Sequence, residues 1–270
     1  MKTGPLEQNI VSELKQTAKY GALCDETLLR MASWAAARHA SPREALKAAK
    51  RKLHQVYGAY CDKWDLRRVA DIVQALPAEP DADTVRSACR GILQHHASTR
   101  ERTAILDLML PEVLKAVGPI SSLLDLACGL GPFMAPWMAM SPGTAYHAVD
   151  IDTRLIGILD LFLMKLGLRG GARCCDLLVS VPDTAVDVAL LLKALPCLEQ
   201  QEKGAGLRIL PQIHARHLVV SFPTQSLGGR PKGMAQHYDT YLHGLAASLD
   251  FSVQTYRFPL ETFYLLTPPA

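Results

Sequence analysis

SSLLDLACGLGPFMAPWMAMSPGTAYHAVDID, residues 121–152, decides the fold of this chain. The stretch predicts a buried strand at 123–126, a loop of small residues, a helix opened by Pro132, and a second strand at 145–149 that ends on Asp150. A strand, a loop, a helix and a strand in this order form half of a nucleotide-binding α/β unit. The sequence therefore predicts a mostly parallel sheet with a ligand site at the loop.

The residues of the loop narrow the choice of ligand. They follow the pattern Asp125-x-Ala127-x-Gly129-x-Gly131, and small residues let the backbone approach a ligand closely. Asp150 ends the next strand, where an acid can accept both hydroxyls of a ribose. A dinucleotide site would require G-x-G-x-x-G. The spacing instead resembles the first motif of class I methyltransferases, which bind S-adenosylmethionine; a glycine-rich turn without a ligand is the alternative.

Composition limits the class of protein. No apolar run approaches the roughly twenty residues that span a bilayer, and the start, MKTGPLEQNIVSELKQ, lacks the apolar segment of a signal peptide. We therefore expect a cytoplasmic protein without a membrane partner. The seven cysteines, with the adjacent pair Cys174 and Cys175, fit a reducing compartment. No pair has C-x-x-C spacing, so no metal site is expected.

Positive charge is concentrated in the first part of the chain. Residues 1–106 contain 17 Lys and Arg against 12 Asp and Glu, and the remainder contains 12 against 14. Ser41, Pro42 and Glu44 predict a capped helix start. One face of this helix is apolar, and the other is a basic strip of Arg43, Lys47, Lys50, Arg51 and His54. Arg67 and Arg68 follow on the next helix. Phosphates of a nucleic acid suit such a strip; a solvated helical face is the alternative.

Further apolar runs predict the rest of the sheet. Strands are expected at 172–175, 186–192, 217–222, 251–258 and 262–266, the last two as an antiparallel pair. In open parallel sheets, ligands bind outside the carboxyl ends of the strands. Asp176 and Lys193 directly follow two of these strands. We expect Asp176 to accept a hydrogen bond from an adenine amino group, and Lys193 to lie over the site or to extend into solvent.

The segment from Ser98 to Pro111, which precedes residues 121–152, predicts an ordinary helix start. Ser98 and Glu101 have the spacing of a capping box. The helix that they would open is expected to be interrupted by Pro111.

Four segments, in this order and spacing, resemble one known family: HASTRER (96–102), LDLACGLGP (124–132), LLLKALPCLE (190–199) and VVSFPTQSLGGRPKGM (219–234). They are similar to the aminoglycoside-resistance 16S rRNA methyltransferases, which modify guanine N7 in the decoding site. LHQVYGAY (53–60) also resembles the amino-terminal domain of that family. The resemblance implies a helical domain at 1–103 that docks on the 30S subunit. A class I, Rossmann-like α/β methyltransferase domain would follow at 104–270.

The resemblance also implies roles for individual residues. Together with Gly129 of the loop, the implied cofactor contacts are Tyr60, His96, Ala97, Ser98, Arg102, Ala127, Asp150, Asp176, Leu177, Leu192 and Gln201. Arg102 would pair with the methionine carboxylate of S-adenosylmethionine. Lys193 would matter for activity, and Met234 would help to hold an extruded guanine. Apart from the resemblance, we expect Arg230 and Lys232 of the basic loop to hold the surrounding rRNA. The family commonly has Asn where this chain has Gly131.

Guanine N7 carries a lone pair and no proton, so methyl transfer to it needs no general base. We therefore expect Lys193 to contact the guanine O6 or a phosphate, and the protein to act as a monomer on 16S rRNA in the 30S subunit. Two alternatives remain at this point. One is a methyltransferase of a small molecule or a protein, which would not need the basic strip. The other is a non-catalytic rRNA-binding or assembly factor with a retained cofactor fold.

Overall fold

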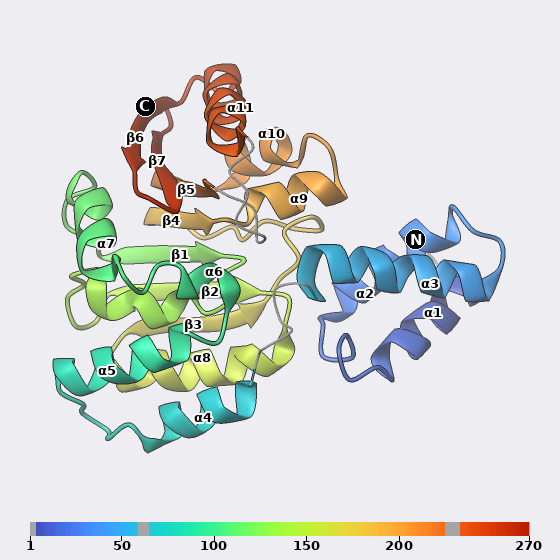
Figure 1. Cartoon of the computed structure of the whole chain (residues 1–270), viewed down its shortest axis with the longest axis horizontal. Helices are drawn as coiled ribbons and strands as arrows, with labels where there is room; N and C mark the ends of the chain where they lie inside the picture. The colour runs from blue at the N-terminus through green and yellow to red at the C-terminus, as the bar shows by residue number, and fades with distance from the viewer. Residues whose placement is uncertain (1–3, 59–64, 225–232, 270) are drawn as a thin grey trace.

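The computed structural model describes residues 4–58, 65–224 and 233–269. At its centre is a seven-stranded sheet in the order β3-β2-β1-β4-β5-β7-β6 (Figure 1). β7 runs antiparallel to β5 and β6, and the remaining neighbours are parallel. The strands are β1 (Ser122–Leu126), β2 (Ala145–Asp150), β3 (Arg169–Cys174), β4 (Val186–Leu192), β5 (Ala215–Pro223), β6 (Ser252–Arg257) and β7 (Glu261–Thr267). The predicted α/β sheet, with its antiparallel pair at the end of the chain, is confirmed.

Helices cover both faces of this sheet, and each face has its own hydrophobic cluster. One face packs against α4 (Leu66–Ala75), α5 (Ala82–Leu93), α7 (Leu106–Lys115), α8 (Thr153–Lys165) and a short 3-10 helix (Gly131–Trp137). The other packs against α9 (Leu195–Gln201), α10 (Ala205–Ile209), a 3-10 turn (Leu210–Gln212) and α11 (Met234–Ser248). β4 lies between them and is continuously apolar from Val188 to Leu191, as a strand buried on both faces must be.

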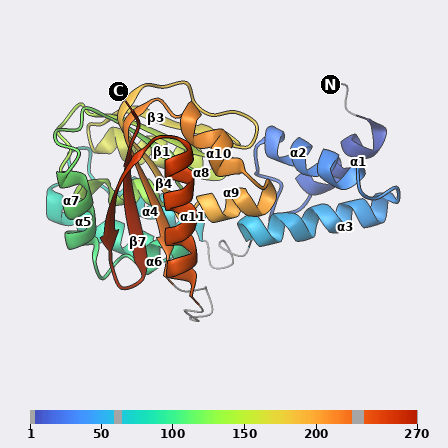
Figure 2. The ribbon, with the colours of Figure 1, turned by 90° about the horizontal axis from the view of Figure 1, so that it is seen from above.

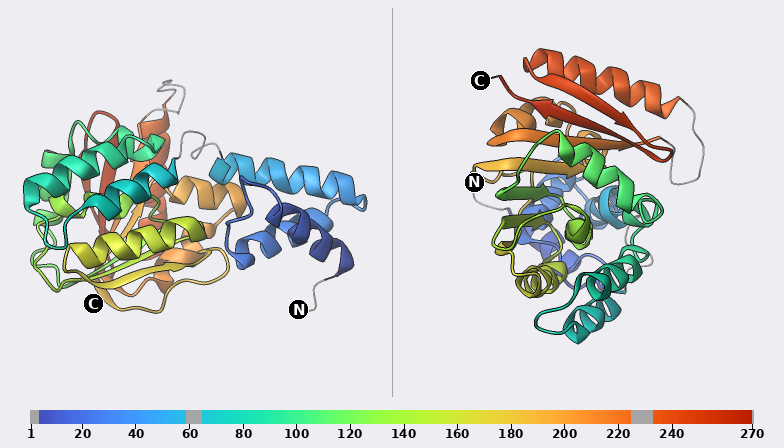
Figure 3. Two further views of the ribbon diagram at one scale, coloured as in Figure 1. Left: turned by 90° about the horizontal axis from the view of Figure 1, so that it is seen from below. Right: turned by 90° about the vertical axis from the view of Figure 1, so that its left-hand side faces the viewer.

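The first three helices form a separate bundle, here called the N-terminal unit (residues 4–58). It contains α1 (Pro5–Lys15), α2 (Asp25–Ala36), α3 (Pro42–Leu53) and a π-helical turn (His54–Gly58). Ile10, Leu14, Leu28, Met31 and Leu53 are among the residues that form its own core. The unit projects to one side of the α/β part (Figures 1, 2 and 3), and the π-helical turn that follows α3 contacts α9.

The hydrophobic clusters divide the chain at a different place from the predicted boundary at residue 103. Apolar residues of α4 and α5, among them Val69, Val73, Val85 and Ile92, belong to the cluster on the sheet rather than to that of the N-terminal unit. The division into functional domains at 1–103 and 104–270 therefore stays a prediction.

Of two expectations that rested on proline, the interruption of a helix at Pro111 was wrong. Pro132 opens a helix as expected, although it is a seven-residue 3-10 helix. Pro136 has no N–H to donate to the carbonyl of Pro132, so an α-helix cannot continue there. Conversely, α7 passes through Pro111 without interruption. Met109, Leu110, Val113 and Leu114 are buried along this helix, and their packing outweighs one missing hydrogen bond.

The helix start predicted at Ser41 and Pro42 is confirmed, with Ser41 at the N-cap and Pro42 as the first residue of α3, although the Ser41 side chain makes no capping hydrogen bond. The capping box predicted for Ser98 and Glu101 was wrong. The short helix α6 (Ala97–Arg100) is capped by His96, whose Nδ1 accepts from the N–H of Ser98 at 3.3 Å. Glu101, the supposed partner of Ser98, pairs with Lys193 at 2.6 Å instead. A long-range ion pair has therefore replaced the local contact.

Candidate active site

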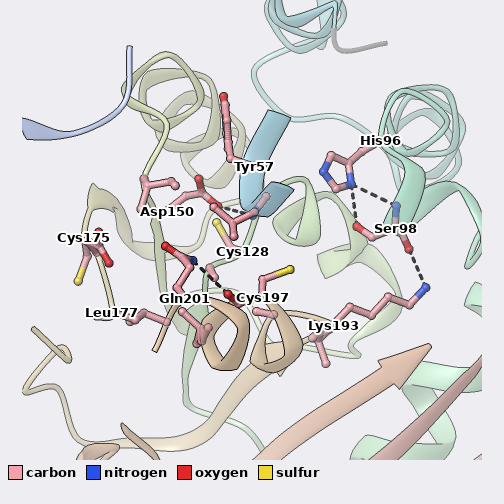
Figure 4. A pocket seen from close by; sticks show the side chains of 18 of the residues that line it. Tyr57, His96, Ser98, Cys128, Asp150, Cys175, Leu177, Lys193, Cys197 and Gln201 are labelled. Atoms are coloured by element: carbon pink, nitrogen blue, oxygen red, sulfur yellow. Dashed lines mark hydrogen bonds between the residues drawn. The ribbon is translucent and has the colours of Figure 1, made fainter. Parts of the chain in front are cut away.

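A pocket lies where the parallel strands end, and it is lined by residues of the α/β part and of the N-terminal unit. It is lined by Arg30, Val56, Tyr57, His96, Ser98, Arg102, Ala127, Cys128, Gly129, Asp150, Ile151, Cys175, Asp176, Leu177, Leu192, Lys193, Ala194, Cys197, Leu198 and Gln201. Figure 4 shows His96, Ser98 and Lys193 together on one side of the pocket, and Asp150, Cys175, Leu177 and Gln201 on the other.

The loop after β1 has the backbone that its small residues predict. Ala127 and Gly129 both have positive φ, at 49° and 50°, a region that residues other than glycine rarely adopt. A Cβ atom at Gly129 would meet nothing within 4 Å, so the pocket is open at this point. Gly131 is different, because a Cβ there would lie 2.7 Å from Oδ2 of Asp125. The asparagine common in the family would require Asp125 to shift.

The two acids at the strand ends are held differently. Asp150 accepts from the N–H of Gly129 at 2.8 Å and from the N–H of Asp152 at 3.1 Å. Burial raises the pKa of Asp150, although these two N–H groups oppose the shift. A ribose hydroxyl that donated to this carboxylate would stabilise its charged form.

Asp176 is engaged from outside the sheet. Its Oδ1 accepts from the N–H of Leu178 at 3.0 Å, and its Oδ2 accepts from the Thr27 hydroxyl at 2.8 Å and from Nε of Arg30 at 2.9 Å. Both donors belong to α2 of the N-terminal unit. Arg30 Nη2 also donates to Oε1 of Gln201 at 2.9 Å.

His96 is a neutral hydrogen-bonding group in this pocket. Burial, followed by the charges of Arg102, Lys193 and Arg100, lowers its pKa to about 4. Its Nδ1 lies 2.7 Å from Oγ of Ser98, which belongs to the same pocket wall.

A buried ion cluster joins Arg102 and Lys193, two of the basic residues of the pocket. Arg102 donates to both oxygens of Glu261, from Nη2 at 2.6 Å and from Nε at 2.7 Å. Nζ of Lys193 lies 2.6 Å from Glu101, 3.3 Å from Glu261 and 3.3 Å from the carbonyl of Ser98. The backbone of Lys193 has φ of 58°, and its N–H donates to the carbonyl of Ser221. Its place above the end of β4 is therefore fixed by specific contacts and is not that of a side chain in solvent.

The structure brings most of the predicted cofactor residues together. His96, Ser98, Arg102, Ala127, Gly129, Asp150, Asp176, Leu177, Leu192 and Gln201 line the one pocket, as does Lys193. Ala97 lies between two of them in α6. Tyr60 lies outside the described residues.

Most of the described residues predicted to bind RNA are exposed. Arg43, Lys47, Arg51 and His54 are exposed, and Lys50 is half-buried, so the basic strip exists. Arg67 and Arg68 are exposed on α4. Met234 begins α11 and is absent from the described lining of the pocket. Arg230 and Lys232 fall outside the described residues.

Several residues of the site were missed by sequence reasoning. Tyr57 lies inside the quoted segment LHQVYGAY and could have been found there. Arg30 and Glu261 belong to no quoted segment. Cys128 and Cys197 also line the pocket. Burial raises the pKa of Cys128, which fits packing rather than reactivity.

The described ranges contain neither a metal-ligating cluster nor a membrane-spanning helix. Within them, no group of three or more His, Cys, Asp or Glu side chains could hold a metal ion. No helix among the described residues has the length and apolarity needed to cross a membrane.

The strand order and a pocket at the carboxyl ends of the strands define the class of the protein, the Rossmann-like methyltransferases. Residues 16–265 match the family model described as ribosomal RNA methyltransferase (FmrO). The chain therefore belongs to the FmrO family of ribosomal RNA methyltransferases.

Similar proteins align with most or nearly all of this chain. A 16S rRNA (guanine(1405)-N(7))-methyltransferase of Micromonospora echinospora is 38% identical, over 94% of this chain and 93% of its own. A protein of the same name from Serratia marcescens is 32% identical over 87% of each. The crystal structure of the 16S rRNA methyltransferase RmtF in complex with S-adenosyl-L-homocysteine has a TM-score of 0.85 and 31% identity, and covers 99% of this chain and 100% of that one.

Proposed function

We propose that this protein transfers the methyl group of S-adenosylmethionine to N7 of guanine 1405 in 16S rRNA, within the assembled 30S subunit. The supporting observation is that one pocket collects nearly all the residues expected at a cofactor site, beside a helical unit with an exposed basic strip. The 38% identical relative from Micromonospora echinospora bears the name of this activity. We expect the enzyme to work as a monomer in the cytoplasm, where ribosomes are.

The residues present fit the cofactor. Asp150 offers a carboxylate for the ribose, and the open space at Gly129 admits a close ligand. Arg102 uses Nε and Nη2 for Glu261, while its Nη1 has only the sulfur of Met134, at 4.0 Å, among the described residues. That nitrogen is available for the methionine carboxylate as a charge-assisted contact. When bound, the cofactor supplies the electrophilic methyl group.

Catalysis then rests on position and charge. Because guanine N7 has no proton to lose, no side chain has to act as a general base. The nucleophile, methyl carbon and sulfur must instead be in line at a near-attack distance. A base inside folded rRNA cannot reach such a pocket without leaving its stack, so we propose that the guanine is flipped out.

Lys193 is proposed as the catalytic residue because its ammonium is buried at the pocket wall. Its side chain is 8% exposed and lies between the carboxylates of Glu101 and Glu261. Such a charge can hold the guanine O6 or a phosphate, but it cannot accept a proton. Met234 at the start of α11 is proposed to support the extruded base.

The N-terminal unit is proposed to dock on the ribosome through phosphate contacts. The basic strip on α3, with Arg67 and Arg68, would read backbone and shape rather than base sequence. Arg230 and Lys232 would add contacts near the pocket. The methylated N7 is positively charged and cannot accept a hydrogen bond, so the modified ribosome should resist cationic aminoglycosides.

The direct test is methyl transfer from labelled S-adenosylmethionine to purified 30S subunits, with free 16S rRNA and protein as controls. The modified nucleotide is mapped by strand scission specific for N7-methylguanine. One modified guanine in the decoding region, on 30S subunits only, is the expected result. Label absent from 30S subunits, despite measurable cofactor binding, would move the substrate elsewhere and refute the proposal.

A further inference from the structure

The N-terminal unit reaches into the cofactor side of the pocket. Arg30 of α2 lines the pocket, its side chain is only 22% exposed, and it makes an ion pair with Asp176 at 2.8 Å. Thr27, one turn earlier on α2, is buried and donates to the same carboxylate oxygen. A helix of the expected docking part is therefore bonded to the acid expected to recognise adenine.

The chain segments on both sides of this contact are also joined. The N–H of Cys24 donates to the carbonyl of Ile151 at 2.8 Å, and the N–H of Thr153 donates to the carbonyl of Ala22 at 2.8 Å. These bonds tie the start of α2 to the loop directly after Asp150. The register of α2 against the sheet is thus fixed by the backbone, and the place of Arg30 follows from it.

Arg30 orients two side chains at once. One edge of its guanidinium holds Oδ2 of Asp176, and its Nη2 holds Oε1 of Gln201. The other end of the Gln201 amide donates to the carbonyl of Cys197 at 3.1 Å. A planar guanidinium fixes such partners better than a lysine ammonium can. Oδ1 of Asp176 accepts from Leu178 alone among the described residues, so a lone pair remains there for another donor.

We propose that Arg30 is a positioning residue for the adenine of the cofactor, acting through Asp176 and Gln201. The N-terminal unit is then part of the cofactor site as well as the expected docking surface. Because Arg30 holds Oδ2 of Asp176, Oδ1 of Asp176 is oriented toward the 6-amino group of adenine. The inference rests on the proposed function, because it takes S-adenosylmethionine as the ligand.

The test compares two ligands that differ at position 6 of the purine, where the expected contact lies, and in the proton that the 6-oxo form carries on N1. Titration calorimetry measures the affinity for S-adenosylhomocysteine and for its inosine analogue, in which an oxygen replaces the 6-amino group. Wild type should prefer the adenine form by about 10-fold or more, the range of a hydrogen bond to a charged acceptor. Arg30→Met should reduce this preference to about 3-fold or less, and Arg30→Lys should restore part of it.

Arg38→Met is the matched control, because Arg38 is an exposed arginine beyond the end of α2 that stacks on Trp34; its adenine preference should equal that of wild type. If Arg30→Met does not fold, Thr27→Val removes the other α2 donor to Asp176, and it should lower the preference to a smaller extent. A variant that binds more weakly but keeps the full preference would overturn the inference, as would a wild type that binds both ligands equally. A wild type that binds neither would refute the proposed function itself.

Discussion

Arg102 and Glu261 face each other inside the protein as a two-pronged ion pair, with exposed fractions of 3% and 1%. They are 159 positions apart in the chain. Ser221 donates to the same carboxylate, and Lys193 lies 3.3 Å from it. Glu261 therefore sets the position of both cations that the methyl-transfer site is proposed to use.

Replacing Glu261 with Gln should destabilise the fold. Removing one partner of a buried pair leaves a charge without compensation, which costs about 3–5 kcal/mol of unfolding free energy. Denaturant unfolding at neutral pH measures this loss. Glu112→Gln, at an exposed position, should change the unfolding free energy by less than about 0.5 kcal/mol. Equal stability of Glu261→Gln and wild type would contradict the structure of the cluster.

The effect of Glu261 should also depend on pH in a defined direction. Burial acts to raise the pKa of Glu261, but the charges of Arg102 and Lys193 and the hydrogen bonds outweigh it, so the pKa lies below 4.5. A lowered carboxyl pKa gives stability that is present above the unfolded-state pKa and is lost as the pH falls through the folded-state pKa. The difference between wild type and Glu261→Gln should therefore shrink in acid. A difference independent of pH would be inconsistent with an ionised Glu261.

Because of His96, the free energy of unfolding should decrease as the pH falls from about 6.5 to 4. Its folded-state pKa of about 4 lies below the usual 6.5, so the unfolded chain binds more protons in this window and stability rises with pH. The shift corresponds to roughly 3 kcal/mol across the window. His96→Gln should lose this part of the pH dependence, and exposed His237→Gln should keep it. Parallel stability curves for wild type and His96→Gln would disprove the assignment.

Asp150→Asn should weaken cofactor binding. The carboxylate now receives N–H groups from Gly129 and Asp152, one on each oxygen. In asparagine, the side-chain NH2 group would face one of these two N–H donors, and the negative charge beside the ribose would be lost. We therefore expect the affinity for S-adenosylmethionine to fall by about 10- to 100-fold. Calorimetry measures it, with Asp183→Asn, at a side chain 90% exposed, as control. Unchanged affinity would exclude Asp150 from ribose binding.

Lys193→Met should separate binding from turnover. The ammonium is expected to act on guanine or phosphate, so methylation of 30S subunits should fall by roughly 100-fold, within the range for losing a preorganised charge. Affinity for S-adenosylmethionine should change by less than about 3-fold. Exposed Lys203→Met is the control. Full activity together with full 30S affinity in Lys193→Met would remove this residue from the mechanism.

The basic strip should contribute through phosphates. In the double variant Arg43→Gln and Lys47→Gln, 30S affinity should fall, and its salt dependence should flatten by roughly 0.7 to 0.9 in log–log slope for each phosphate that the variant no longer neutralises. Cofactor affinity should not change, because both side chains are exposed on α3 outside the pocket. Lys115→Gln with Lys203→Gln removes the same charge elsewhere on the surface. An equal loss in both double variants would mean that only net charge matters.

The sequence by itself determined the strands and the residues that directly follow them. β4 was predicted with the bounds that the structure gives, since its central residues from Val188 to Leu191 are buried from both sides and form a visible apolar run. Asp150 and Asp176 were placed at the site because side chains after parallel strands meet at one edge of a sheet. β3 began earlier than predicted, at Arg169, because Gly170 and Gly171 carry no strand signal and their pairing with β2 is a tertiary contact.

Only the tertiary structure decided which partners the polar side chains of the site have. Ser98 and Glu101 have a capping-box spacing, yet Glu101 pairs with Lys193, 92 residues away. Arg30 reaches Asp176 across 146 positions, and Glu261 reaches Arg102 across 159. Local spacing reports only what lies within a helical turn or along a strand. A buried charged side chain pairs with the opposite charge that the packed fold places beside it. Burying that charge without a partner would cost more free energy than a local hydrogen bond could return.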